Sequence, residues 1–101
     1  MNFNKKVWQA CKKIPKGKVT TYKAIAKALN TKAYKAVGNA LRNNPHAPRV
    51  PCHRVINSND KLGGYKGKKN SKEKIKLLKK EGIEIKKGKI LNFKNKIFQF
   101  I

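Results

Sequence analysis

The stretch that organises the fold is residues 21–42, TYKAIAKALNTKAYKAVGNALR. Thr21 is a suitable N-cap, and the apolar residues after it recur at helical spacing, which predicts a first helix over residues 22–29. Asn30 is expected to end this helix, and Thr31 to cap a second one that reaches the end of the stretch. Two short helices joined by a tight turn are the layout of a DNA-binding helix-turn-helix, although ordinary helical hairpins have the same spacing.

The second of these helices combines basic and small side chains. Its outward residues are expected to be Lys32, Lys35, Asn39 and Arg42. The small residues along it are Ala33, Ala36, Gly38 and Ala40. Small side chains permit a close approach, and the approaching group is either a neighbouring helix or a DNA backbone. Spacing alone leaves both open.

Short elements are expected on both sides of this motif. Apolar residues at helical spacing predict an amphipathic helix over residues 3–13, with Cys11 on its buried face. A further helix is expected over residues 71–81, closed by a glycine, followed by a small hairpin over 83–90. The apolar tail, residues 93–101, is expected to dock on the body. The fold class is therefore mainly α, with short β-hairpin elements, and the length of 101 residues indicates one domain.

The chain is strongly basic. Lysine and arginine together number 27 against four acidic residues, giving a formal net charge of +23. An excess spread along the whole chain indicates a broad phosphate-facing surface, with binding that weakens as salt rises. The alternative is the solvated surface of a protein from a lysine-rich proteome, in which case the charge says little about partners.

The sequence shows no apolar run long enough to span a bilayer and no segment that resembles a signal peptide. The two cysteines, Cys11 and Cys52, are therefore expected to be free thiols in a reducing cytosol. The cysteines and histidines lack a recognisable ligand spacing for zinc, so no metal site and no cofactor are expected.

The segment Pro51-Cys52-His53-Arg54-Val55 places a thiol beside an imidazole. A thiol is a strong nucleophile only as thiolate, and a neighbouring base or positive field produces thiolate at neutral pH. The prolines that precede the thiol make a stiff lead-in, as a pre-positioned nucleophile requires. A soft nucleophile in a chain this basic suggests chemistry performed on nucleic acid.

These segments resemble the active-site region of the O6-alkylguanine-DNA alkyltransferase family. The likeness lies in residues 35–45, KAVGNALRNNP, and residues 51–55, PCHRV. It extends to GKVTTY at 17–22, GYKG at 64–67 and LLKKEG at 77–82. It runs in unbroken order over roughly residues 3–90, so the chain is identified as a member of the family, with its catalytic C-terminal domain only.

The resemblance implies a winged helix-turn-helix that binds double-stranded DNA through the minor groove. The protein would flip O6-alkylguanine, chiefly O6-methylguanine, out of the duplex, since the alkylated oxygen is otherwise inaccessible. The alkyl group would then pass in line to the Cys52 thiolate and form a thioether, which has no easy leaving chemistry. The protein would act once, as a methylated-DNA–protein-cysteine methyltransferase, without a cofactor or an obligate protein partner and as a monomer.

The resemblance also assigns catalytic roles. Cys52 matches the alkyl acceptor, and His53 the general base, which acts through a bound water. Glu81 matches the carboxylate that orients His53. Asn44 matches the asparagine that ties the recognition helix to the active-site turn. Tyr22 matches the tyrosine that donates to the flipped guanine and crowds the rotated phosphate.

The same matches assign substrate and DNA contacts, in an active-site loop over residues 44–56 and a pocket loop over 62–68. The Val55 carbonyl would accept the guanine amine, and Leu41 would pack against the flipped base. The residues that would line the alkyl pocket are Tyr65, Lys66 and Gly67. The expected DNA-binding residues are Thr21, Tyr22, Lys32, Lys35, Ala36, Gly38, Asn39 and Arg42.

Two features depart from the family pattern. Family members place an arginine where Lys35 stands, as a finger that replaces the extruded base in the stack. Lysine lacks the planar guanidinium, so Lys35 is either a finger or a residue that neutralises a phosphate. The matched region begins almost at Met1, which predicts a minimal module without the family's N-terminal domain and that domain's metal ligands.

Two other functions compete with repair. An alkyltransferase-like protein binds the lesion without repairing it, but such proteins replace the acceptor cysteine, which is present here as Cys52. A basic chromatin-like or winged-helix DNA-binding protein would explain the charge, with Cys52 as an incidental core thiol. It would leave the whole segment 51–55 unexplained.

Overall fold

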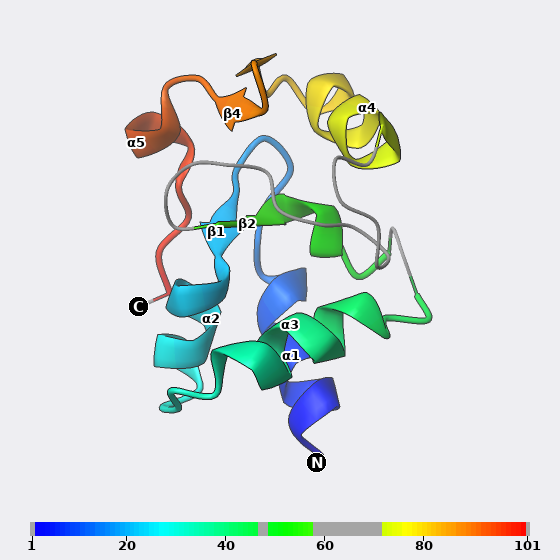
Figure 1. Ribbon diagram of the computed structural model, residues 1–101, viewed down its shortest axis with the longest axis vertical. Coiled ribbons are helices and arrows are strands. Elements are labelled where there is room, and N and C mark those ends of the chain that lie inside the picture. Colours follow the sequence, from blue (N-terminus) through cyan, green and yellow to red (C-terminus); the bar gives the residue numbers. More distant parts are fainter. Residues whose placement is uncertain (1, 47–48, 58–71, 101) are drawn as a thin grey trace.

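The computed structural model describes residues 2–46, 49–57 and 72–100 (Figure 1). The elements in chain order are α1 (Phe3–Lys12), β1 (Thr20–Thr21), α2 (Tyr22–Ala28), α3 (Tyr34–Arg42), the 3-10 helix η1 (Cys52–Arg54), β2 (Val55–Ile56), α4 (Lys72–Lys80), β3 (Ile85–Lys86), β4 (Lys89–Ile90) and α5 (Phe93–Lys96). The first three helices form one half of the molecule, and α4, the β3–β4 hairpin and α5 form the other (Figure 1). The strands β1 and β2 lie between the halves. The mainly α class with short strands is confirmed.

The first helix of the helix-turn-helix begins as predicted. The Thr21 side-chain oxygen accepts a hydrogen bond from the Ala24 backbone N–H at 3.0 Å, which satisfies one of the amides left open at a helix start. Asn30 follows the helix in the left-handed conformation, with φ of 57°. A short polar side chain tolerates this conformation, so Asn30 ends the helix as expected.

The second helix begins later than predicted. It starts at Tyr34, with Ala33 as N-cap and no side-chain capping bond. The expected cap, Thr31, instead accepts a hydrogen bond from the Ala33 backbone N–H at 3.1 Å. The threonine hydroxyl therefore closes a local turn two residues on, in competition with helix capping. The prediction for Thr31 is wrong, and Lys32 lies in the connecting turn rather than on the helix.

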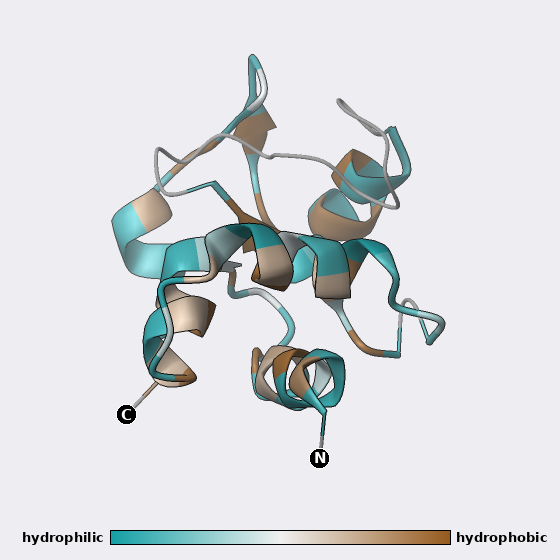
Figure 2. Ribbon diagram, turned by 60° about the horizontal axis from the view of Figure 1, so that its bottom comes forward, coloured by the Kyte–Doolittle hydropathy of each residue, from teal (hydrophilic) through white to brown (hydrophobic). Residues whose placement is uncertain are grey.

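The helices α1, α2 and α3 pack on one another around an apolar core. In Figure 2 the apolar side of α3 faces α1. The Trp8 indole N–H donates to the Ala40 carbonyl at 2.7 Å, which fixes α1 against α3. Cys11 is fully buried in this core, as the helical spacing predicted. Core residues shared by these elements are Val7, Cys11, Ile25, Val37, Leu41, Cys52 and Val55.

The strands β1 and β2 pair in parallel, with Thr20 opposite Val55 and Thr21 opposite Ile56. Parallel pairing needs a long crossover, which α2, α3 and the chain after them supply. The pairing sets the start of α2 beside the residues that follow Cys52. A tyrosine at the first position of α2 is thereby brought to the cysteine from thirty positions away in the sequence.

The end of α4 is closed by Gly82, as predicted. Gly82 has φ of 87°, a left-handed conformation that favours glycine. Its N–H donates to the Lys79 carbonyl, and the Ile83 N–H to the Leu78 carbonyl, both at 3.0 Å. This is the Schellman arrangement, and it fixes the residue before the glycine, Glu81, at the end of the helix. The predicted start at residue 71 lies outside the described residues.

The remaining predictions for the second half also hold. β3 and β4 pair antiparallel, and both Lys87 and Gly88 at the turn have positive φ, as a type I′ hairpin turn requires. The tail docks through two backbone bonds: Val19 N–H donates to the Lys96 carbonyl at 2.9 Å, and Phe98 N–H to the Val19 carbonyl at 2.7 Å.

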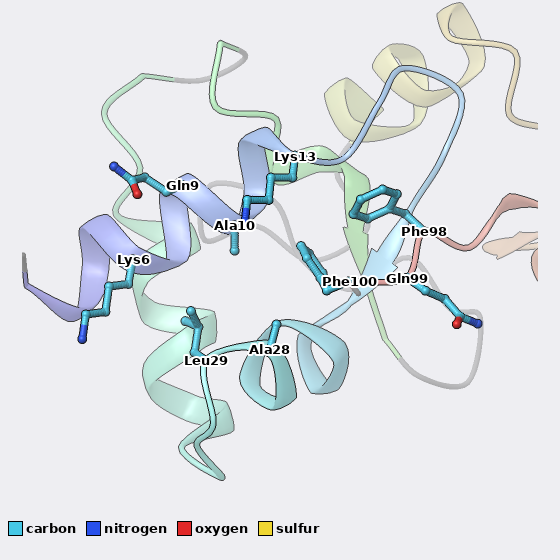
Figure 3. A pocket seen from close by; sticks show the side chains of 9 residues that line it. All are labelled: Lys6, Gln9, Ala10, Lys13, Ala28, Leu29, Phe98, Gln99 and Phe100. Carbon is cyan, nitrogen blue, oxygen red and sulfur yellow. The ribbon is translucent and has the colours of Figure 1, made fainter.

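A groove of about 530 Å³ lies between α1, the end of α2 and this tail (Figure 3). Phe98, Phe100, Leu29 and Ala10 line its apolar part. No residue of η1 or β2 contributes to it, so it is separate from Cys52. None of the helices in the described part of the chain has the length and apolar character needed to cross a bilayer.

Candidate active site

A tight turn at Pro51 sets the position of the Cys52 thiol. Pro51 has φ of −81° and ψ of 64°, and the Cys52 N–H donates to the Val50 carbonyl at 2.8 Å. These values define an inverse γ-turn, and the pyrrolidine ring holds φ in the range that this turn needs. Cys52 then opens η1, in which the Arg54 N–H donates to the Pro51 carbonyl at 2.9 Å. The proline in front of Cys52 therefore fixes the direction in which the thiol enters the core.

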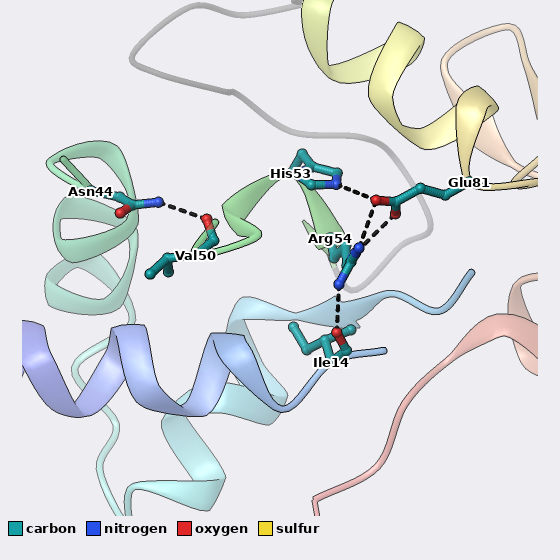
Figure 4. A network of polar contacts seen from close by, with 6 residues as sticks. All are labelled: Ile14, Asn44, Val50, His53, Arg54 and Glu81. Carbon is teal, nitrogen blue, oxygen red and sulfur yellow. Dashed lines mark hydrogen bonds and ion pairs between the residues drawn. The ribbon is translucent and has the colours of Figure 1, made fainter. Parts of the chain in front are cut away.

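Asn44 holds the same turn from the other side (Figure 4). Its side-chain N–H donates to the Val50 carbonyl at 2.8 Å, and its side-chain oxygen accepts from the His46 N–H at 2.9 Å. The Val50 carbonyl thus accepts from both Asn44 and Cys52, using both lone pairs. Asn44 lies just after the end of α3, so this side chain joins the second helix of the helix-turn-helix to the turn that presents the thiol.

Cys52 is buried, with 6% of its surface exposed, in the core that it shares with Cys11 and Leu41. Tyr22 packs against the same core from the start of α2. Burial first, and then the electrostatic effects of Cys52 and Cys11, raise the pKa of the Tyr22 hydroxyl. Tyr22 therefore keeps its proton at neutral pH and is available as a hydrogen-bond donor close to the two sulfurs.

The two cysteines differ in what they can do. Cys11 is fully buried, and its pKa is raised by burial and by the nearby Cys52 charge. A thiol held in its protonated form is a poor nucleophile, so Cys11 is inert core. Cys52 stands on the turn described above, next to an imidazole.

His53 forms an acid–base pair with a carboxylate far away in sequence. Its Nε2 atom lies 3.0 Å from Oε2 of Glu81 at the end of α4. His53 is 1% exposed, and this burial lowers its pKa, although the hydrogen bond and charge of Glu81 act in the opposite direction. The imidazole is therefore neutral near pH 7. With Nε2 engaged by the carboxylate as donor, Nδ1 is the basic nitrogen.

Arg54 clamps the same carboxylate (Figure 4). Its Nε donates to Oε1 of Glu81 at 2.9 Å and its Nη2 to Oε2 at 2.7 Å, while Nη1 donates to the Ile14 carbonyl at 2.7 Å. This two-point fork fixes the plane of the carboxylate. Burial alone would raise the pKa of Glu81, but the hydrogen bonds from Arg54 and His53 outweigh it and lower the pKa. Glu81 therefore stays ionised.

Val55 follows η1, and its carbonyl accepts a hydrogen bond from the Lys74 ammonium at 2.7 Å. Lys74 is on α4 and is fully buried. The carbonyl expected to accept a guanine amine is thus already held by a lysine, and its second lone pair could serve a ligand.

The residues expected to contact DNA fall into three groups. The exposed residues are Lys32, Lys35, Asn39 and Arg42, and the half-buried ones are Tyr22, Ala36 and Gly38. Three of the exposed residues form the solvent-facing side of α3, so the basic face anticipated from spacing exists. Thr21 is buried, and its hydroxyl is used as the helix cap. The expected pocket residues Tyr65, Lys66 and Gly67 lie outside the described residues.

Sequence reasoning missed two residues of this site. The sequence indicates Arg54 only as part of a positive field, because its partners Glu81 and Ile14 lie 27 and 40 positions away. Lys74 could have been found from its spacing in the sequence. It lies four residues before Leu78 and seven before Glu81, so it shares the inward face of α4 with them. A lysine on that stripe is a candidate buried cation.

Comparison with known proteins finds relatives of this chain both in sequence and in structure. Residues 2–83 match the family model of the 6-O-methylguanine DNA methyltransferase, DNA binding domain. A methylated-DNA–protein-cysteine methyltransferase from Methanosarcina acetivorans is 53% identical over 81 residues, which are 79% of this chain and 51% of that protein. The chain therefore spans about half the length of the curated relatives it matches.

Solved structures agree with this match. The Schizosaccharomyces pombe protein Atl1, in complex with damaged DNA containing O6-carboxymethylguanine, superimposes with a TM-score of 0.84 at 31% identity, covering 97% of this chain and 95% of that one. Mycobacterium tuberculosis OGT in complex with DNA gives a TM-score of 0.73 at 43% identity, covering 80% of this chain and 50% of that one.

Proposed function

Since the chain belongs to the O6-methylguanine DNA methyltransferase family, we propose that it repairs O6-alkylguanine in duplex DNA by transferring the alkyl group to Cys52. The observation that carries the proposal is the assembly at η1. A buried cysteine on a proline-fixed turn is followed by a neutral histidine, and that histidine is oriented by a carboxylate that an arginine holds. Nucleophile, base and orienting group are the parts that covalent catalysis needs.

The proposed step balances in protons and electrons. The Cys52 thiol gives its proton to Nδ1 of His53, directly or through a water, and Glu81 stabilises the resulting imidazolium. The thiolate attacks the alkyl carbon, so a sulfur–carbon bond forms and the carbon–O6 bond breaks. The electron pair goes to the guanine, to which the Tyr22 hydroxyl would donate a hydrogen bond. The thioether product ends the reaction after one turnover.

The basic face of α3 supports DNA as the partner. Lys35, Asn39 and Arg42 are exposed along it, and Lys32 precedes it. Phosphate contacts of this kind position a protein on DNA, whereas the chemistry selects the lesion. The two similar structures described above are complexes with DNA, and the Atl1 complex contains O6-carboxymethylguanine.

The test is intact mass after incubation with a duplex that carries one O6-methylguanine, beside an undamaged duplex. One methyl increment on the peptide that contains Cys52, with the lesion restored to guanine, is expected only with the damaged duplex. Cys52→Ala should bind the duplex and gain no mass, and Cys11→Ala, the matched control, should gain the methyl group. An unchanged wild-type mass with the lesion still present would remove the repair function.

The Atl1 match favours a second candidate, recognition of the lesion without transfer. That protein and this chain cover each other almost completely, and its structure is a complex with damaged DNA. The same experiment decides between the two, because lesion-selective binding with no mass increment in the wild type would support recognition alone. The presence of Cys52, His53 and Glu81 together favours transfer.

A further inference from the structure

A lysine occupies one of the two fully buried positions of α4, beside a leucine at the other. Lys74 has no exposed surface, and its ammonium donates to the Val55 carbonyl at 2.7 Å. Lysine is almost never fully buried, because an ammonium loses much of its hydration energy there. In a chain with 27 basic residues and four acidic ones, an exposed position would be easy to find for any single lysine. The burial of this one therefore needs a reason.

The groups around Lys74 suggest that reason. Its ammonium interacts electrostatically with Cys52 on η1, and more weakly with Cys11 on α1. The Lys74 charge in turn acts to lower the pKa values of both His53 and Cys11. Burial lowers the Lys74 pKa to about 8, while negative charge at Cys52 acts to raise it. The ammonium form is therefore the major one at neutral pH, and it is held at the Val55 carbonyl, three residues after Cys52.

The other cation near the thiol is differently engaged. Arg54 makes two hydrogen bonds to the Glu81 carboxylate, so its positive charge is largely balanced within that pair. The described hydrogen bond of Lys74 goes to a neutral carbonyl. The Lys74 ammonium lies in a buried site, where charges interact more strongly than in water.

We propose that Lys74 is a positioning residue for Cys52: its buried ammonium stabilises the thiolate and at the same time fixes the Val55 carbonyl beside the reacting group. The proposal deepens the proposed function, since a thiolate is the form that accepts an alkyl group. When His53 removes the thiol proton, a negative charge forms in the core. A cation already in place lowers the cost of that charge without any rearrangement.

The test is the thiolate absorbance near 240 nm, followed against pH on the protein alone. In a Cys11→Ala background only Cys52 contributes a thiol, and a Cys11→Ala/Cys52→Ala protein supplies the tyrosine baseline. Lys74→Met should move the Cys52 midpoint upward by about one unit or more, which is roughly a tenfold loss of thiolate at neutral pH. Lys76→Met, on the exposed side of the same helix, removes the same charge and should leave the midpoint within a few tenths of a unit.

A reciprocal measurement needs no substitution at Lys74. Coupled groups shift one another, so removing the thiol must alter the lysine titration. The ¹³Cε signal of Lys74 should titrate well below those of the exposed lysines, and Cys52→Ala should lower its midpoint further. An unchanged Cys52 midpoint in folded Lys74→Met, or an unchanged Lys74 midpoint in Cys52→Ala, would overturn the proposal. Both measurements omit DNA, so their outcome is independent of whether alkyl transfer occurs.

Discussion

Replacing Lys74 by methionine should stabilise the fold, and the gain should shrink as pH rises. Methionine keeps the length of the side chain and removes the charge. Lys74 is fully buried, and its pKa falls from 10.5 to about 8 on folding. The difference of about 2.5 units is worth about 3 kcal/mol at 1.36 kcal/mol per unit. Part of this gain is offset by the lost hydrogen bond to Val55, worth about 1 kcal/mol.

The sign of the pH dependence follows from proton binding. Between the folded value of about 8 and the unfolded value of 10.5, the unfolded chain holds more protons on this lysine than the folded protein does. Stability from Lys74 therefore rises with pH in this window. The advantage of Lys74→Met over wild type should be largest near pH 7 and about 2 kcal/mol smaller near pH 9.5.

Urea unfolding of both proteins at several pH values measures this difference. Cys11 acts in the opposite direction, because its raised pKa means that the folded protein holds more thiol protons at high pH. The Cys11→Ala background removes that contribution, and Lys76→Met controls for the change in net charge. A stability difference that stays constant from about pH 7 to 9.5 would refute the reasoning, since it would mean that Lys74 keeps an ordinary pKa in the fold.

Three further predictions concern the turn and the helix end. Glu81→Gln should slow alkyl transfer by roughly 10²-fold or more, because the base loses the group that orients it. It should also lower the free energy of unfolding by about 3 kcal/mol, because Arg54 loses its ionic partner. Full transfer activity in a stopped-flow assay would contradict the first expectation. Asn44→Ala should cost about 1–2 kcal/mol in urea unfolding and slow transfer, whereas Asn44→Asp should recover stability only in part, because it cannot donate to the Val50 carbonyl. Gly82→Ala should cost about 1 kcal/mol from its positive φ alone, since the new Cβ meets no atom within 4 Å. Gly38→Ala, at an ordinary helical φ and also unobstructed, should instead gain up to about 1 kcal/mol, and equal effects at the two glycines would be inconsistent with backbone strain as the cause.

The features that could be predicted from sequence are those decided by neighbouring residues. The Thr21 cap and the Gly82 helix end depend on side-chain and backbone chemistry within a few positions. The prediction that Thr31 caps a helix is wrong for an equally local reason. A threonine hydroxyl can close a turn as well as cap a helix, and the spacing of residues does not distinguish the two.

The candidate site was predictable only in part, because its contacts join distant segments. Nothing in the spacing of residues 53 and 81 pairs a histidine with a glutamate, and the family resemblance supplied that match. The arginine fork on the carboxylate and the lysine on the Val55 carbonyl went unnoticed, since each partner is 19 or more positions away. Such contacts become visible only when α4 packs on η1.

The balance of charges at η1 explains why two cations serve one thiol. A carboxylate next to His53 is needed to orient the base, but its negative charge also opposes a thiolate nearby. Arg54 offsets that charge by holding Glu81 through two hydrogen bonds. With the Glu81 charge balanced, the buried Lys74 ammonium can favour the anionic form of Cys52. Burying a cation for function lowers the free energy of unfolding of the protein, as strained functional sites generally do. The prediction that Lys74→Met is more stable and less reactive is therefore a single claim about the same charge.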